Sequence, residues 1–198
     1  MFSSYTDVFT DNEYPNLKTG EREIQSIIEI QNEYIQKPTW RKYQDFMVAC
    51  DVDMKDVMYK RLNKIGLNFT KANSDLLEEI QEEVGVLAMQ LKKHYNRARP
   101  YQIAYYTGQD LHPFNTITGN TPAYPSGHAM QSRFLLKIVA FNFPKYKDEI
   151  KKLANDIAFT RIVMGVHFQS DNDFGFKIAD KLATYPQIID KYFTNKIF

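Results

Sequence analysis

The longest periodic stretch of the sequence, from Ser74 to Arg97, constrains the fold more than any other feature. Apolar residues recur there every three or four positions and form one stripe: Leu76, Leu77, Ile80, Val84, Leu87, Ala88 and Leu91. This spacing is typical of an amphipathic helix that buries one face. Asp75 and Glu78 have the spacing of a capping box that would start the helix. Pro100 would end it, because a proline disfavours helical geometry in the preceding residue.

Shorter helical patterns fill most of the remaining chain. They run from Glu21 to Gln36, Trp40 to Val48, Asp53 to Ile65, Ser126 to Pro144, Ile150 to Ala158, His167 towards Leu182, and from Pro186 onward. The sequence has no alternating apolar runs and no Asn-Gly hairpin signal. We therefore predict an all-α, single-domain helical bundle, with a loop of about 24 residues after Pro100. Residues 1–20 are expected to form an irregular N-terminal arm, and residues 21–198 to form the domain.

The charges are balanced, with 25 Lys plus Arg against 24 Asp plus Glu. Such a chain creates no overall field that would attract nucleic acid or an anionic membrane, so an anion site must be local. The longest apolar stretch, Phe134 to Phe143, is shorter than the ~20 residues of a membrane span. The first residues lack the pattern of a secretory signal. These observations predict a soluble, cytoplasmic protein and leave its oligomeric state open.

Cys50 is the only cysteine. A single cysteine excludes an internal disulfide, and Cys50 is expected to be a small buried or half-buried hydrophobic residue. The four histidines have no Cys or Glu partner at ligand spacing, so the case for a zinc site is weak.

The stretch from Tyr124 to His128 leads directly into a helical pattern and is suited to bind an anion. The first N–H groups of a helix have no intrahelical partner and carry the positive end of its dipole. Gly127 would let the backbone approach a ligand, Ser126 would add a hydroxyl, and His128 could carry a proton. Considered alone, the stretch is equally well interpreted as an ordinary capped turn.

Lys92 and Arg99 lie seven residues apart, which is nearly two helical turns, so one helix would present both on the same face. The alternative is a solvated basic helix end that complements the dipole. His94 and Arg97 lie off that face, and we expect both to be solvated.

His167 and Asp171 are four residues apart. On a shared helix, the carboxylate could accept a hydrogen bond from one ring nitrogen and leave the other free. Arg161 lies six residues before His167, and Gly165 offers a break that could turn the arginine towards the same point. A lone His–Asp pair of this kind is more often a surface hydrogen bond.

Together these segments closely resemble the three signature motifs of the type 2 phosphatidic acid phosphatase (PAP2) superfamily. The matching segments are Lys92-x6-Arg99-Pro100, Pro125-Ser126-Gly127-His128 and Arg161-x5-His167-x3-Asp171. The superfamily includes soluble bacterial class A acid phosphatases, membrane lipid phosphatases and vanadium haloperoxidases. Thr160 stands where the family usually has serine, and it keeps the hydroxyl. The missing signal sequence also differs from the class A enzymes, which are typically periplasmic.

The resemblance implies a helical phosphatase of the acid phosphatase–haloperoxidase type. The implied phosphate-binding residues are Lys92, Arg99, Ser126, Gly127 and Arg161. The implied nucleophile is His167, which Asp171 would orient and which would form a phosphohistidine. The implied acid and base is His128, which would protonate the leaving oxygen and then activate water.

No step of this mechanism requires a metal or another cofactor, and vanadate is expected to bind as a phosphate mimic. The expected partner is a small phosphorylated substrate. Two alternatives stay open: a vanadium-dependent haloperoxidase-like enzyme, and a non-catalytic phosphate-binding helical protein.

Overall fold

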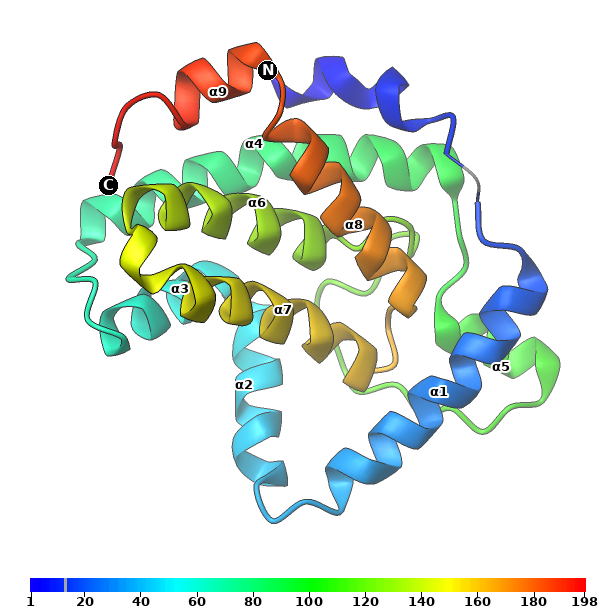
Figure 1. Cartoon of the computed structure of the whole chain (residues 1–198). Helices are drawn as coiled ribbons and strands as arrows, with labels where there is room; N and C mark the ends of the chain where they lie inside the picture. Colours follow the sequence, from blue (N-terminus) through cyan, green and yellow to red (C-terminus); the bar gives the residue numbers. More distant parts are fainter. Residues whose placement is uncertain (13) are drawn as a thin grey trace.

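The structure is a computed structural model that describes residues 1–12 and 14–198 (Figure 1). The helices are η1 (Phe2–Phe9), α1 (Leu17–Ile35), α2 (Trp40–Val52), α3 (Met54–Lys64), α4 (Lys71–Tyr95), α5 (Pro100–Thr107), α6 (Gly127–Asn142), η2 (Pro144–Tyr146), α7 (Lys147–Val163), α8 (Gln169–Leu182) and α9 (Pro186–Tyr192). The part of the chain that the structure describes contains no strand. The all-α fold class predicted from the sequence is therefore confirmed.

Helix α6 lies at the centre of the bundle, where it packs against α4, α7 and α8 (Figure 1). Its buried side chains are found on most sides of the helix: Ala129, Met130, Ser132, Phe134, Leu135, Leu136, Ile138, Val139 and Asn142. A helix that is apolar almost all round is stable only inside a protein. The sequence thus places the N-terminus of α6 in the interior.

Helix α8 approaches the first turn of α6 closely because Gly175 has no side chain. A Cβ atom at Gly175 would lie 2.8 Å from the backbone oxygen of Ser126 and 3.1 Å from the backbone nitrogen of Met130. This contact fixes the start of α6 against α8.

The boundaries of α4 differ from those predicted. The helix begins at Lys71, where Thr70 and Asn73 form the capping box. It ends at Tyr95, because Asn96 adopts a left-handed backbone with φ of 48°. Pro100 opens α5 and does not close α4, since proline fits the first position of a helix well. The loop before α6 is therefore shorter than expected.

The prediction of an irregular N-terminal arm is wrong for residues 2–9 and 17–20. Residues 2–9 form η1, which packs on α4 and buries Phe2 and Phe9. The ring of Phe2 meets that of Phe134 edge-on at 5.2 Å. Residues 17–20 belong to α1, which Asn16 caps. Residue 13 lies outside the described residues.

The main apolar core joins η1, α2, α3, α4, α6, α7, α8 and α9. Cys50 is completely buried and packs in this core, as predicted. Within the described residues, no helix is long and apolar enough to cross a membrane.

Candidate active site

The N-terminus of α6 is capped by Ser126, whose hydroxyl accepts a hydrogen bond from the backbone N–H of Ala129 at 3.3 Å. The backbone N–H of Ser126 donates to the backbone oxygen of Asp171 at 3.0 Å. A Cβ atom at Gly127 would lie 3.9 Å from Cε of Lys92. Residues from all three sequence motifs therefore meet at this helix end.

Lys92 and Arg99 reach the site in a different way from that predicted. Lys92 lies in the last turns of α4, whereas Arg99 lies beyond that helix, with extended backbone, and caps α5. The expectation of a shared helical face is wrong because Asn96 ends α4 between the two residues. Both side chains are nevertheless buried within the protein.

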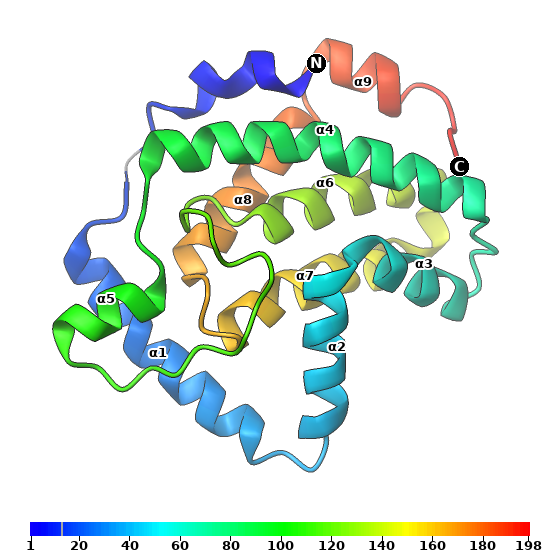
Figure 2. The ribbon, with the colours of Figure 1, turned by 180° about the vertical axis from the view of Figure 1, so that it is seen from behind.

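Both cations bind the loop that leads from α5 to α6. Nζ of Lys92 donates to the backbone oxygen of Pro122 at 2.5 Å. Nε of Arg99 donates to the backbone oxygen of Thr121 at 2.8 Å, and Nη1 donates to that of Val166 at 2.7 Å. Figure 2 shows the loop running through the region bounded by α4, α5 and α2. The loop thus covers these two cations.

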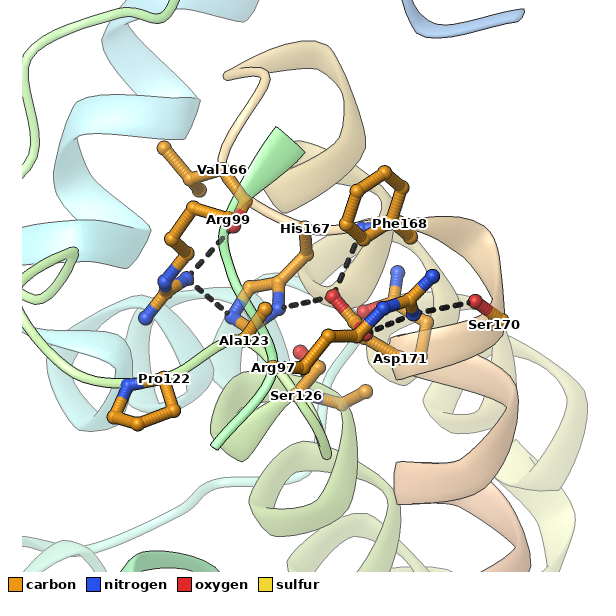
Figure 3. A network of polar contacts seen from close by, with 12 residues as sticks. Arg97, Arg99, Pro122, Ala123, Ser126, Val166, His167, Phe168, Ser170 and Asp171 are labelled. Carbon is orange, nitrogen blue, oxygen red and sulfur yellow. Dashed lines mark hydrogen bonds and ion pairs between the residues drawn. The ribbon is translucent and has the colours of Figure 1, made fainter. Parts of the chain in front are cut away.

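His167 lies between Arg99 and Asp171 (Figure 3). Nδ1 of its ring is 3.0 Å from Oδ2 of Asp171, and Nε2 is 2.9 Å from Nη1 of Arg99. Because a guanidinium has only donors, Nε2 accepts and Nδ1–H donates to the carboxylate. The ring therefore carries its lone pair on Nε2, where it accepts from Arg99.

The predicted His167–Asp171 contact is present, although the two residues do not share a helix. His167 precedes α8, and Asp171 occupies the third position of that helix. Oδ2 of Asp171 also accepts from the backbone N–H of Phe168 at 2.9 Å. The carboxylate thus orients the imidazole and caps α8 at the same time.

Arg161 is completely buried near the end of α7. Gly165, with φ of +72°, turns the chain after this helix as the sequence predicted. Nη1 of Arg161 donates to Oδ1 of Asp51 at 2.8 Å. Nη2 donates to the hydroxyls of Thr116 and Thr118 at 3.1 and 3.0 Å. Nε is buried and has no partner in residues 1–12 and 14–198.

His128 lies one residue after the start of α6 and is partly buried. Its Nε2 atom is 3.1 Å from the backbone oxygen of Cys50. Loss of hydration and the positive charge of Arg161 lower the pKa of His128 to about 3. The ring is therefore neutral when no anion is bound.

Buried positive charge dominates the electrostatics of the site. Loss of hydration, together with the nearby charge of Arg99, holds the pKa of Lys92 well below its usual value. Burial lowers the pKa of Arg99 to about 10. Burial and then Arg99 also lower the pKa of His167. Each lowered pKa means that the protonated, positively charged form of the side chain is disfavoured in the site. A bound anion would stabilise that form and so oppose the shift.

Arg97 is a buried residue of the site, and the prediction that it is solvated is wrong. Its Nη1 atom donates to Oδ1 of Asp171 at 2.6 Å and to Oγ of Ser170 at 2.7 Å (Figure 3). Its Nη2 atom lies 3.1 Å from Oε2 of Glu23. Its partners are more than 70 residues away along the chain, so local spacing carried no signal of them. His94 is exposed, as predicted.

Asp51, Thr116 and Thr118 were likewise missed, because nothing in their local sequence links them to Arg161. Among residues 1–12 and 14–198, no group of three or more His, Cys, Asp or Glu side chains is arranged to hold a metal ion.

Comparison with known families gives a match to the model described as PAP2 superfamily over residues 67–184, a range that includes all three motifs. The chain is 30% identical over 84 residues to a non-specific acid phosphatase of Salmonella typhimurium, covering 42% of this chain and 33% of that protein. It is 31% identical over 87 residues to a lipid A 1-phosphatase of Rhizobium johnstonii, covering 44% and 35%. The chain thus spans less than half the length of these relatives.

A solved structure shares the fold. It is the crystal structure of the first transmembrane PAP2 type phosphatidylglycerolphosphate phosphatase from Bacillus subtilis, which superposes with a TM-score of 0.62. The sequence identity is 16%, and the match covers 98% of this chain and 96% of that one.

Proposed function

The chain belongs to the PAP2 superfamily, and we propose that it hydrolyses phosphomonoesters without a metal ion, through a phosphohistidine intermediate. The observation that carries the proposal is the contact of His167 with both Arg99 and Asp171 at the N-terminus of α6. A nucleophile, the group that orients it and a phosphate-binding cation occupy one small volume. The sequence similarity of the chain to a non-specific acid phosphatase and a lipid A 1-phosphatase is consistent with this chemistry.

The phosphate would be bound by cations and by the start of α6. Lys92, Arg99 and Arg161 would surround its oxygens, with the backbone of Ser126 and Gly127 at the helix N-terminus. Nε–H of Arg161 has no partner among the described residues and would gain one. These donors would stabilise the charge on the transferring phosphoryl group.

In the first step, Nη1–H of Arg99 would turn from Nε2 of His167 to a phosphate oxygen, and Nε2 would attack phosphorus while the bond to the leaving oxygen breaks. His128 would give that oxygen a proton. The negative charge of the bound phosphate would raise the pKa of His128 and supply the protonated form. In the second step, His128 would take a proton from water, the water oxygen would attack phosphorus, and the N–P bond would break to release inorganic phosphate.

In this mechanism, phosphate can reach the site only if the loop between α5 and α6 moves. We call this loop, residues 108–126, the covering loop. The side chains of Lys92, Arg99, Arg161, His167 and Asp171 belong to residues that are no more than 4% exposed. Nζ of Lys92 donates hydrogen bonds to the backbone oxygens of Pro122 and Ala123. A phosphate that enters would replace these oxygens as the partners of the lysine.

The direct test is hydrolysis of p-nitrophenyl phosphate by the purified protein in the presence of EDTA. Wild type and the control His94→Ala should turn over, because His94 is exposed and outside the site. His167→Ala should be inactive. Activity that is lost with EDTA and restored by Mg²⁺ or Zn²⁺ would contradict the metal-independent mechanism.

The substrate class can be narrowed with the same assay. Nucleoside monophosphates, alkyl phosphates and a lipid phosphomonoester in detergent cover the range that the names of the relatives suggest. Halide oxidation after vanadate loading would support the haloperoxidase alternative. Phosphate binding without any turnover would support the non-catalytic alternative.

A further inference from the structure

Asp51 is a buried carboxylate at the end of α2 whose side chain is 5% exposed. It lies outside the residues that match the PAP2 superfamily and outside the three motifs. The family match and the three motifs therefore assign no role to Asp51.

The contacts of Asp51 form a closed network with Arg161 and the covering loop. Oδ1 accepts from Nη1 of Arg161 at 2.8 Å and from the hydroxyls of Thr116 and Thr118, both at 2.6 Å. Oδ2 accepts from the backbone N–H of Ile117 at 2.7 Å. Each threonine hydroxyl donates its proton to Asp51 and accepts from Nη2 of Arg161. All four residues are thus tied to one carboxylate.

The charge of Asp51 is well stabilised. Burial acts to raise its pKa, but the hydrogen bonds of Thr116 and Thr118 and the charge of Arg161 outweigh this and lower the pKa to about 2. Asp51 is therefore ionised wherever the protein is folded near neutral pH.

In this network, two of the three guanidinium nitrogens of Arg161 donate hydrogen bonds, and the third donates none. Nη1 and Nη2 are held by Asp51 and the threonines, whereas Nε is buried and has no partner in the part of the chain that the structure describes. A buried N–H without a partner is costly, so this nitrogen favours an added acceptor. The guanidinium is thereby held with one donor available.

We infer that Asp51 is a positioning residue for phosphate binding: it fixes Arg161 so that Nε–H is available to the phosphate, and it anchors residues 116–118 of the covering loop. The inference rests on the proposed function of the site. Asp51 would act through Arg161 and not by touching the phosphate.

The test compares Asp51→Asn with Asp45→Asn, a control that removes an exposed carboxylate from the same helix. Binding of inorganic phosphate is measured by titration calorimetry, and KM and kcat are measured with p-nitrophenyl phosphate. Asp51→Asn should weaken phosphate binding and raise KM by about tenfold or more, with a smaller loss of kcat. Asp45→Asn should bind phosphate like wild type.

A second pair of variants serves if Asp51→Asn does not fold. Thr116→Val removes one bridging hydroxyl and should weaken phosphate binding. Thr116→Ser keeps the hydroxyl and should bind phosphate like wild type. A merely structural role for Thr116 would not depend on the hydroxyl in this way.

A double-mutant cycle tests whether Asp51 acts through Arg161. In an Arg161→Gln background, Asp51→Asn should cause little further loss of phosphate affinity. Fully additive losses would overturn the inference. Tighter phosphate binding by Asp51→Asn would also overturn it, because Asp51 would then be competing with the phosphate.

The outcomes separate the inference from the proposed function. Active wild type with an Asp51→Asn variant that binds phosphate normally would overturn only the role of Asp51. Wild type that binds phosphate without turnover would overturn the proposed function, and the binding measurements would still decide the role of Asp51. Wild type that does neither would overturn both.

Discussion

Nη1 of Arg97 lies 2.6 Å from Oδ1 of Asp171, and both side chains are almost completely buried. The other oxygen of the same carboxylate holds Nδ1 of His167. Burial raises the pKa of Asp171, and the charge of Arg97 opposes that rise. Arg97 therefore supports the negative charge that orients His167.

Replacing Arg97 by methionine should destabilise the protein strongly, because the buried carboxyl of Asp171 would lose its main partner and would either stay ionised at a high cost or take up a proton. Loss of one member of a buried ion pair typically costs about 3–5 kcal/mol. Turnover should fall as well, since protonated Asp171 would no longer orient His167 correctly. Urea unfolding and kcat measurements test both effects.

The matched control is Arg133→Met, which breaks a partly exposed pair with Asp180. Such pairs contribute about 0–1 kcal/mol, so the loss of stability should be small. Equal losses for the two variants would contradict the role given to Arg97.

Gly175→Ala should disturb the site through the backbone. The added Cβ would lie 2.8 Å from the backbone oxygen of Ser126, which can move only if α6 or α8 moves. We expect a loss of about 1–3 kcal/mol in unfolding free energy and lower activity. Thermal unfolding and phosphate affinity measure these effects.

Gly85→Ala is the control for Gly175→Ala. The new Cβ at Gly85 would meet the flexible amide end of Gln131 at 3.1 Å. Replacing glycine in a helix gains about 1 kcal/mol of helix propensity, which should offset the contact. A Gly175→Ala protein as stable and active as Gly85→Ala would show that close α6–α8 packing is unimportant.

The main helices and the three motifs could be predicted from the sequence because their signals are local. Apolar spacing defines α4, and Ser126 begins α6 as predicted. The start of α5 was missed because a proline can both follow one helix and open the next. The burial of Phe2 and Phe9 was missed because it depends on the distant surface of α4.

The candidate site was only partly predictable for the same reason. The meeting of Lys92, Arg99, Arg161 and His167 followed from the family resemblance and not from spacing. Asp51 lies 110 residues from Arg161 in the chain, so local periodicity could not connect them. Only the folded chain brings such charges together.

The folding stability of wild type should depend on Asp51 in acid. Its pKa is about 2 in the folded protein against an ordinary value of 3.8. A lowered pKa stabilises the fold above the ordinary value, and this stabilisation is lost as the pH falls towards the lowered one. The stability advantage of wild type over Asp51→Asn should therefore shrink from about pH 4 to about pH 2. Urea unfolding across this range is the measurement, and a constant difference would contradict the assigned ion pair.

His128→Ala should separate the two chemical steps. p-Nitrophenolate leaves without much help from an acid, so the first step should proceed, whereas hydrolysis of the phosphohistidine should stall without the base. Rapid mixing should show a nitrophenolate burst approaching one equivalent of enzyme. An alkyl phosphate should give no burst. Equal loss of both substrates would assign His128 a structural or phosphate-binding role.

In the proposed mechanism, His167 forms a covalent bond to phosphorus. Its Nε2 atom carries the lone pair of the ring, because Nδ1–H donates to Asp171 and Nε2 accepts from Arg99. The phosphoenzyme formed in this way should be labile to acid and stable to base, as a phosphoramidate is.

The most direct measurement is rapid quenching of His128→Ala with a radiolabelled aryl phosphate, followed by peptide mapping of the label. Label is expected on His167, and no label is expected when His167→Ala is added, although the doubly substituted protein should still bind phosphate. Label on another residue, or rapid turnover of the aryl phosphate by His167→Ala alone, would contradict the proposed mechanism.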